Sequence, residues 1–71
     1  MKIAILGAGM IGSAIAIDLS RQFEVTSFDI SEINLSALKE QTSIKCIKCD
    51  LSQYNEYADL LAKYDLVVSA V

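Results

Sequence analysis

The chain has 71 residues, 54% of them hydrophobic, and a formal net charge of −3 from nine acidic and six basic side chains. It is too apolar to be disordered, and its negative charge gives no electrostatic support for nucleic-acid binding. Its longest uncharged stretch, residues 3–17, is shorter than the roughly 20 apolar residues that a membrane span needs. Because the structural pattern already starts at Lys2, we expect no targeting segment. These features predict a cytoplasmic domain with neither membrane nor nucleic-acid partners.

In the first part of the chain, two short apolar segments lie on either side of a segment with helical periodicity. Residues 2–6 (KIAIL) are short and apolar and are followed by Gly7, which predicts a buried strand. Residues 10–21 predict a helix, because apolar side chains recur there at helical spacing, namely Ile11, Ala14, Ile15 and Leu19. Residues 23–28 are β-branched and aromatic and predict a second strand.

The second part of the chain repeats this alternation. It predicts, in chain order, a helix, a strand, a helix and a strand over residues 31–40, 43–47, 52–64 and 66–71. Ser31 and Ser52 are each expected to cap the helix that follows, because a serine oxygen can accept a hydrogen bond from the free N–H groups of the first turn.

The predicted order β-α-β-α-β-α-β is typical of an α/β fold with a parallel sheet covered by helices on both faces. Right-handed crossovers give the strand order 3-2-1-4 of a Rossmann-type sheet, in which ligands bind beyond the carboxyl ends of the strands, between the first and the fourth. The fourth strand ends without a cover or a partner for its outer edge. We therefore expect a sheet that is incomplete at the C-terminus. Residues 1–71 would be the N-terminal part of a dinucleotide-binding domain, with the substrate and catalytic domain absent from this chain. Oligomerisation through that edge is the alternative.

Three glycines with the spacing G-x-G-x-x-G lie between the first strand and the first helix. Gly7 permits a tight turn, Gly9 lets a pyrophosphate lie against the backbone, and Gly12 lets the helix approach the sheet closely. The free N–H groups and the dipole at the start of that helix attract the anion. This turn predicts a cofactor-binding site formed by Gly7, Ala8, Gly9, Met10, Ile11 and Gly12.

Asp29 closes the second predicted strand, about 20 residues after the first glycine, where the dinucleotide motif places an acidic residue. A carboxylate there accepts hydrogen bonds from the adenosine ribose and repels the 2′-phosphate of NADP. Ile30 follows on the cofactor side, Glu32 adds a second acid, and Arg21 lies on the preceding helix, from which it reaches the ribose only by an improbable path. NAD is therefore predicted in preference to NADP. A solvated carboxylate at the strand end is the alternative interpretation.

The ends of the third and fourth strands supply the remaining candidates. Asp50 is expected either at the edge of the adenine, with Leu51 against the ring, or as a carboxylate at a helix start beside Ser52. Ser69 and Ala70 close the fourth strand at the switch point of the sheet, where small side chains leave room for the middle of the cofactor.

Neither a catalytic set nor a metal site is predicted. The chain has no histidine, and its two cysteines, Cys46 and Cys49, form a single C-x-x-C pair, whereas a structural zinc site needs four ligands. On a strand, residues three apart point to opposite faces, so we expect ordinary buried or half-buried thiols.

The segments KIAILGAGMIGSAIAIDLS, VTSFDIS, KCDLSQY and YDLVVSAV together resemble the N-terminal cofactor domain of the saccharopine dehydrogenase-like family, which includes saccharopine dehydrogenase/reductase and lysine 6-dehydrogenase. The resemblance implies an oxidoreductase that uses NAD(P) at an amine carbon of lysine-derived amino acids, and a full-length protein that is a homo-oligomer. It implies cofactor positions at Gly7, Gly9, Gly12, Asp29, Asp50 and Ala70.

Two other functions share parts of this pattern. The nucleotide-sensing regulatory domains of potassium transport systems have the glycine turn and the acids after the second and third strands, without being enzymes. FAD-dependent oxidoreductases also open with this turn, but they typically place a glutamate on the ribose.

Overall fold

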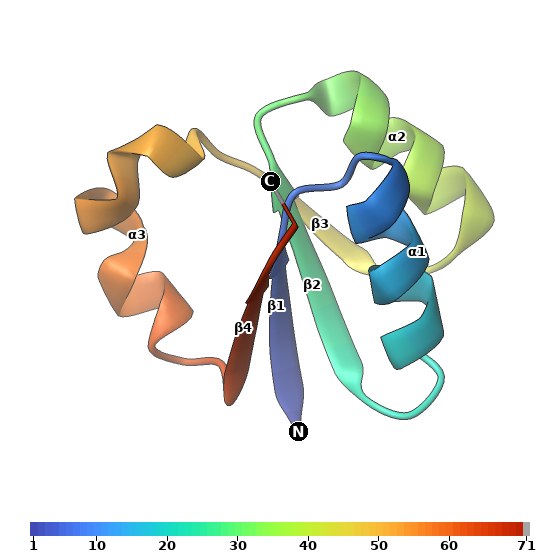
Figure 1. Cartoon of the computed structure of the whole chain (residues 1–71), viewed down its shortest axis with the longest axis horizontal. Helices are drawn as coiled ribbons and strands as arrows, with labels where there is room; N and C mark the ends of the chain where they lie inside the picture. The colour runs from blue at the N-terminus through green and yellow to red at the C-terminus, as the bar shows by residue number, and fades with distance from the viewer. Residues whose placement is uncertain (71) are drawn as a thin grey trace.

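A computed structural model describes residues 1–70, except for the side chains of Tyr54 and Glu56. Strands and helices alternate along these residues as the sequence predicts (Figure 1). The elements are β1 (Lys2–Leu6), α1 (Met10–Leu19), β2 (Glu24–Asp29), α2 (Glu32–Gln41), β3 (Lys45–Lys48), a 3₁₀ turn (Leu51–Gln53), α3 (Tyr54–Leu61) and β4 (Leu66–Ser69). The predicted positions are confirmed, with ends that shift by a few residues, except that Val71, the last residue of the predicted fourth strand, lies outside the described residues.

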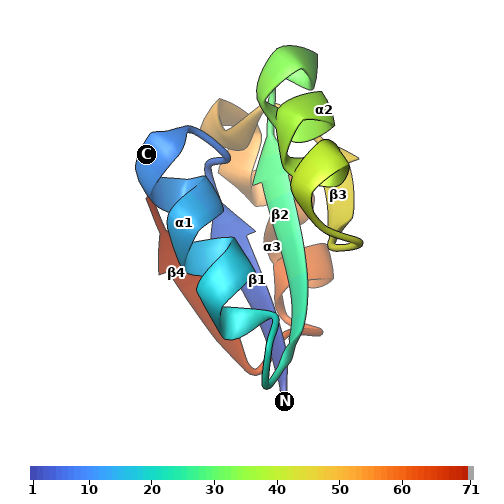
Figure 2. The same ribbon diagram turned by 90° about the vertical axis from the view of Figure 1, so that its right-hand side faces the viewer.

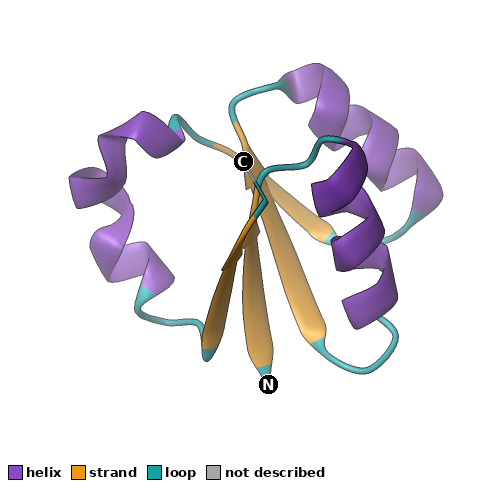
Figure 3. Ribbon diagram, in the orientation of Figure 1, coloured by secondary structure: helices purple, strands orange, loops and turns teal. Residues whose placement is uncertain are grey.

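Within residues 1–70 the strands form one parallel sheet in the order β3-β2-β1-β4, which confirms the predicted order. Because β1 lies inside the sheet, Ile3 pairs with Val25 of β2 on one side and with Leu66 of β4 on the other. The helices α1 and α2 cover one face and α3 covers the other (Figures 2 and 3). All strands point the same way, so their carboxyl ends meet at a single edge.

The core consists of two layers because helices cover both faces of the parallel sheet. The layer under α1 and α2 is built around Ile3, Ile5, Ala8, Ala16, Val25, Leu35, Leu38 and Ile44. The layer under α3 contains Ala4, Phe28, Cys49 and Leu61, and the Phe28 ring packs edge-on against Tyr64 with centroids 5.8 Å apart. β4 is less covered than β1, and its residues Leu66 and Val67 are exposed.

Helix α1 buries a different side from the one that its large apolar residues suggest. The helix packs through Gly12 and Ala16, whereas Ile11 is 69% exposed and Ala14 is exposed as well. The reason is distance: α1 lies so close to the glycine turn that only small residues fit between helix and sheet. Partly buried Ile15 and Leu19 complete the contact, as their spacing predicts.

The two predicted helix caps have different outcomes. Ser31 caps α2, because its Oγ accepts a hydrogen bond from the Asn34 N–H at 3.2 Å. The prediction for Ser52 is wrong: α3 begins at Tyr54 after the 3₁₀ turn, and no side chain caps it in the described part of the chain. Ser52 instead donates its N–H and its hydroxyl to the carboxylate of Asp50, two residues earlier, which accepts both hydrogen bonds.

The two cysteines are free thiols on opposite faces of the sheet, as expected. Cys46 packs against the layer under α1 and α2, and Cys49 is buried in the layer under α3. Burial raises the pKa of both thiols. Among the residues described, no three histidine, cysteine or acidic side chains gather as metal ligands do, and no helix is long and apolar enough to cross a bilayer.

Candidate functional site

The first and third glycines of the turn are required by the fold itself. Gly7 has a φ of 107°, a left-handed conformation that side chains disfavour, and its N–H donates to the carbonyl oxygen of Phe28 at 2.7 Å. A Cβ on Gly12 would overlap the Gly7 carbonyl oxygen and lie 2.8 Å from the Gly7 carbonyl carbon. The predicted roles of a tight turn and of close helix packing are therefore confirmed.

The second glycine, Gly9, has no such reason among the residues that the structure describes. Its φ of −71° and ψ of −162° are ordinary extended values that any residue adopts. A Cβ added to Gly9 would meet no atom within 4 Å among the residues described. Neither backbone conformation nor internal packing explains this glycine, and the space above it is open to a ligand.

The starts of the two helices beside the turn differ in their capping. Helix α2 has its Ser31 cap and an acid, Glu32, in the first turn. Helix α1 starts at Met10 with neither a side-chain cap within residues 1–70 nor an acid in its first turn. The first N–H groups of α1 are therefore left for an external acceptor, and the helix dipole favours a negative one. The exposed Met10 and Ile11 side chains flank this start.

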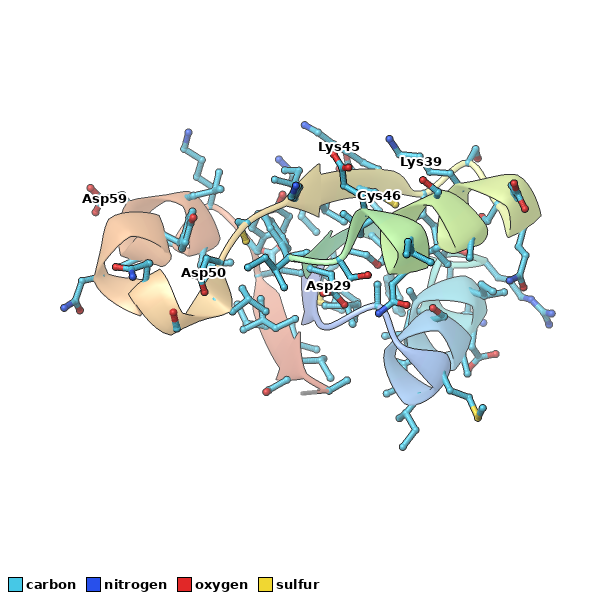
Figure 4. The ribbon with its side chains drawn as sticks, turned by 90° about the horizontal axis from the view of Figure 1, so that it is seen from above. Asp29, Lys39, Lys45, Cys46, Asp50 and Asp59 are labelled. Carbon is cyan, nitrogen blue, oxygen red and sulfur yellow. The ribbon has the colours of Figure 1, made fainter. Side chains whose placement is uncertain are left out.

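Asp29 connects the glycine turn to the start of α2. Its Oδ2 accepts the Ala8 N–H at 2.7 Å, and its Oδ1 accepts the Ser31 N–H at 2.9 Å. Burial acts to raise the pKa of Asp29, but these hydrogen bonds, with further ones from Asn34 and Ile30, outweigh it and lower the pKa. The carboxylate is thus ionised at neutral pH and fixed beside the turn, at the carboxyl edge of the sheet (Figure 4).

Asp50 lies two residues beyond β3. It is a carboxylate at a helix start beside Ser52, which is one of the two roles predicted for it. Its Oδ1 accepts the N–H of Ser52 at 3.0 Å and the hydroxyl of Ser52 at 2.7 Å, and these hydrogen bonds lower the pKa of Asp50. The Asp50 N–H donates to the Tyr57 hydroxyl at 3.3 Å. Leu51 is half-buried against the layer under α3. The adenine role of Asp50 and Leu51 stays a prediction.

The end of β4 lies beside the glycine turn, as the strand order requires. Ser69 pairs with Leu6, and the Ala70 N–H donates to the Leu6 carbonyl oxygen at 2.8 Å. The Ala70 Cβ would be 3.4 Å from a Cβ on Gly12. Arg21, by contrast, lies at the other end of the sheet, near Glu24, the first residue of β2.

Two neighbours of Asp29 were not singled out from the sequence. Asn34 places its Nδ2 3.5 Å from Asp29 Oδ2 and lines a groove of about 490 Å³ between α1 and α2, together with Ala8 and Gly9. Lys48 pairs with Asp29 across the sheet, and its Nζ lies 3.6 Å from Glu32 Oε1. The signal for Asn34 was its position three residues after Ser31, where a capping side chain often stands.

The comparisons with known proteins agree with this geometry. The family model described as "Saccharopine dehydrogenase NADP binding domain" matches residues 3–71. No curated protein sequence matches the chain. Among solved structures, the chain is similar to the apo histidine-tagged saccharopine dehydrogenase (L-Glu forming) from Saccharomyces cerevisiae, with a TM-score of 0.83 and 24% identity. That similarity, which concerns the fold, covers 99% of this chain and 16% of the yeast chain.

The family match supports a nicotinamide dinucleotide as the ligand and does not favour the potassium-transport alternative. It confirms the resemblance seen in the glycine turn, in VTSFDIS and at the end of β4. The chain belongs to the family of saccharopine dehydrogenase NADP-binding domains.

Proposed function

We propose that this domain binds NAD, in preference to NADP, as the cofactor-binding part of an oxidoreductase that acts on an amino acid of the saccharopine or lysine type. The observation that carries the proposal is the open space over Gly9, a glycine that neither conformation nor packing requires. A pyrophosphate lying against that backbone gives the glycine its reason.

The start of α1 suits the negative charge of the pyrophosphate. Its first N–H groups, those of Met10, Ile11 and Gly12, precede the first intrahelical hydrogen bond, which the Ser13 N–H donates to the Gly9 carbonyl oxygen at 2.9 Å. Backbone donors and dipole act together on an anion placed there. When bound, the nicotinamide ring supplies hydride transfer, and the chain's own contribution is to hold the cofactor at a fixed turn.

The charges near Asp29 favour NAD. A 2′-phosphate about 4 Å from the ionised carboxylate would be repelled by about 4 kcal/mol per charge pair at an effective dielectric constant near 20. Glu32 adds a second acidic side chain. It forms an ion pair with Lys48, so that this basic side chain at the carboxyl edge already has an acidic partner. The family's description names NADP, so this preference is a proposal about this member and its particular residues.

The remaining contacts follow from the position of each residue around the carboxyl edge. Ile30, which is exposed directly after Asp29, and Leu51 with Asp50 are proposed to hold the adenine. Ser69 and Ala70 are proposed to lie along the middle of the cofactor, because Ala70 lies beside Gly12. Since this chain spans 16% of the similar yeast enzyme, the substrate and the homo-oligomeric state are proposed from the family resemblance.

The proposal is tested by calorimetric titration of the full-length protein with NADH and with NADPH. We expect NADH to bind more tightly, and Gly9→Ala to weaken NADH binding at least tenfold without unfolding the protein. Tighter binding of NADPH would overturn the argument from Asp29. If neither nucleotide binds to the folded protein, the dinucleotide function itself is wrong. Oxidation of lysine or saccharopine with formation of NADH tests the substrate class.

A further inference from the structure

The side chain of Asn34 is released from the capping role that its position in α2 usually has. Three residues after a serine cap, a capping side chain reaches back to the N–H of the cap residue. Here the Ser31 N–H is already taken by Asp29 Oδ1 at 2.9 Å. The backbone N–H of Asn34 still donates to Ser31 Oγ, so the helix start is satisfied without the Asn34 side chain.

The freed amide faces Asp29. Apart from the N–H of the next residue, Ile30, the carboxylate has three donors in the described part of the chain: the Ala8 N–H, the Ser31 N–H and Asn34 Nδ2. The two backbone bonds are short, at 2.7 and 2.9 Å, whereas the one from Asn34 is 3.5 Å. The Asn34 bond is therefore the weak one, because hydrogen bonds lose strength at such length. Asn34 is the donor that can turn to another acceptor.

The same amide also borders the space over the glycine turn. Asn34 lines the groove between α1 and α2 with Ala8, Gly9 and Ser13, and it is half-buried. Its side chain is thus near the carboxylate proposed for the ribose and borders the same groove as the glycine proposed for the pyrophosphate. The amide carries a donor and an acceptor and no charge, so it can bond a hydroxyl but cannot neutralise a phosphate.

We propose that Asn34 is a second specificity-determining residue of the nucleotide site, which hydrogen-bonds the 2′-hydroxyl of the adenosine ribose beside Asp29. This inference rests on the proposed NAD function. It assigns the recognition of an unmodified ribose to a pair of side chains, a fixed carboxylate and a movable amide, rather than to Asp29 alone.

The test pairs a residue change with a ligand change. NADH and 2′-deoxy-NADH are titrated into the wild-type full-length protein and into Asn34→Ala. Removal of the 2′-hydroxyl should raise the dissociation constant of the wild type by a factor about fivefold larger than that of Asn34→Ala. The reason is that the variant has already lost the hydrogen bond between Asn34 and the 2′-hydroxyl, so it cannot lose it a second time. A loss of stability alone cannot produce this difference, because it affects both ligands equally.

Asn55→Ala is the matched control, since Asn55 is an exposed asparagine on α3. It should show the wild-type ratio of the two ligands. Asn34→Ala should fold, because alanine keeps the backbone N–H that donates to Ser31 Oγ and because alanine has a high helix propensity. If it does not, Asn34→Leu, which also lacks a hydrogen-bonding group, provides the same comparison. Equal effects of the 2′-hydroxyl in wild type and variant overturn the role of Asn34, whereas a wild type that binds no NADH overturns the proposed function.

Discussion

Replacing Gly12 by alanine adds one methyl group at the point where α1 touches the glycine turn. This Cβ would overlap the Gly7 carbonyl oxygen, and it would lie 3.4 Å from the Ala70 Cβ. Neither neighbour moves freely. The Gly7 N–H is bound to Phe28 at 2.7 Å, and the Ala70 N–H is bound to Leu6 at 2.8 Å. The helix itself would have to shift away from the sheet.

The size of the effect follows from two opposing contributions. In an exposed helix interior, a change from glycine to alanine stabilises by about 1 kcal/mol. Overpacking of a filled site costs about 1–3 kcal/mol and sometimes more, and a clash with backbone falls in the upper part of that range. We therefore expect Gly12→Ala to lower the free energy of unfolding by about 2 kcal/mol. That is a large share of the total stability of a small domain, about 0.05–0.15 kcal/mol per residue.

Urea unfolding followed by far-UV circular dichroism measures this change, and Gly9→Ala is the matched control. At Gly9 the same methyl group enters open space. Gly9→Ala should therefore lower the free energy of unfolding by about 1 kcal/mol or less, because alanine is a weaker N-cap residue than glycine. Gly12→Ala should lower the urea midpoint with an unchanged slope. Gly9→Ala should nearly keep the midpoint and lose nucleotide affinity. An unchanged or raised midpoint for Gly12→Ala would refute the packing argument.

Three further predictions concern stability and reactivity. Ser27→Ala should raise the free energy of unfolding by about 1 kcal/mol, because the Ser27 hydroxyl is fully buried without a hydrogen-bond partner among the residues described. A lower urea midpoint would show that the hydroxyl has a partner. Burial acts to raise the pKa of Asp29, but backbone hydrogen bonds lower it below its unfolded value of about 3.9. Asp29 therefore contributes stability above that pH, and this contribution is lost as the pH falls through the lowered folded value. Asp29→Asn should flatten the acid side of the stability profile, and an unchanged profile would contradict this. Burial raises the pKa of the Cys46 and Cys49 thiols, so both should react slowly with a thiol reagent at neutral pH. A disulfide between them in the folded protein, detected by mass spectrometry, would contradict their placement on opposite faces.

The order of the strands could be predicted because it depends on few rules. Alternating apolar and helical segments imply a parallel sheet, and right-handed crossovers leave β1 inside it. The buried face of α1 could not be predicted in the same way. Periodicity selects large apolar residues such as Ile11, whereas the close approach to the turn selects Gly12 and Ala16. Distance between elements is a tertiary property that the hydrophobic pattern of one helix does not contain.

The candidate site was predicted in its backbone and less well in its side chains. Gly7, Gly12 and Asp29 lie where the motif places them, since their roles are set by the local turn and strand end. The cap predicted at Ser52 was wrong, because Asp50 and Ser52 are both good capping residues and only the fold shows that Asp50 is the acceptor, at the 3₁₀ turn that precedes α3. Asn34 was missed because its side chain is free only once Asp29 has taken the Ser31 N–H.

The central place of β1 has a consequence for biosynthesis. β1 is made before the other strands of this sheet, yet the register that joins Ile3 to Leu66 needs a strand made some sixty residues later. Synthesis takes about 3–12 s for such a length at 5–20 residues per second. During that interval the nascent chain carries an apolar strand with one unpaired edge. The strand at the centre of the sheet is therefore also the one that waits longest for its second partner.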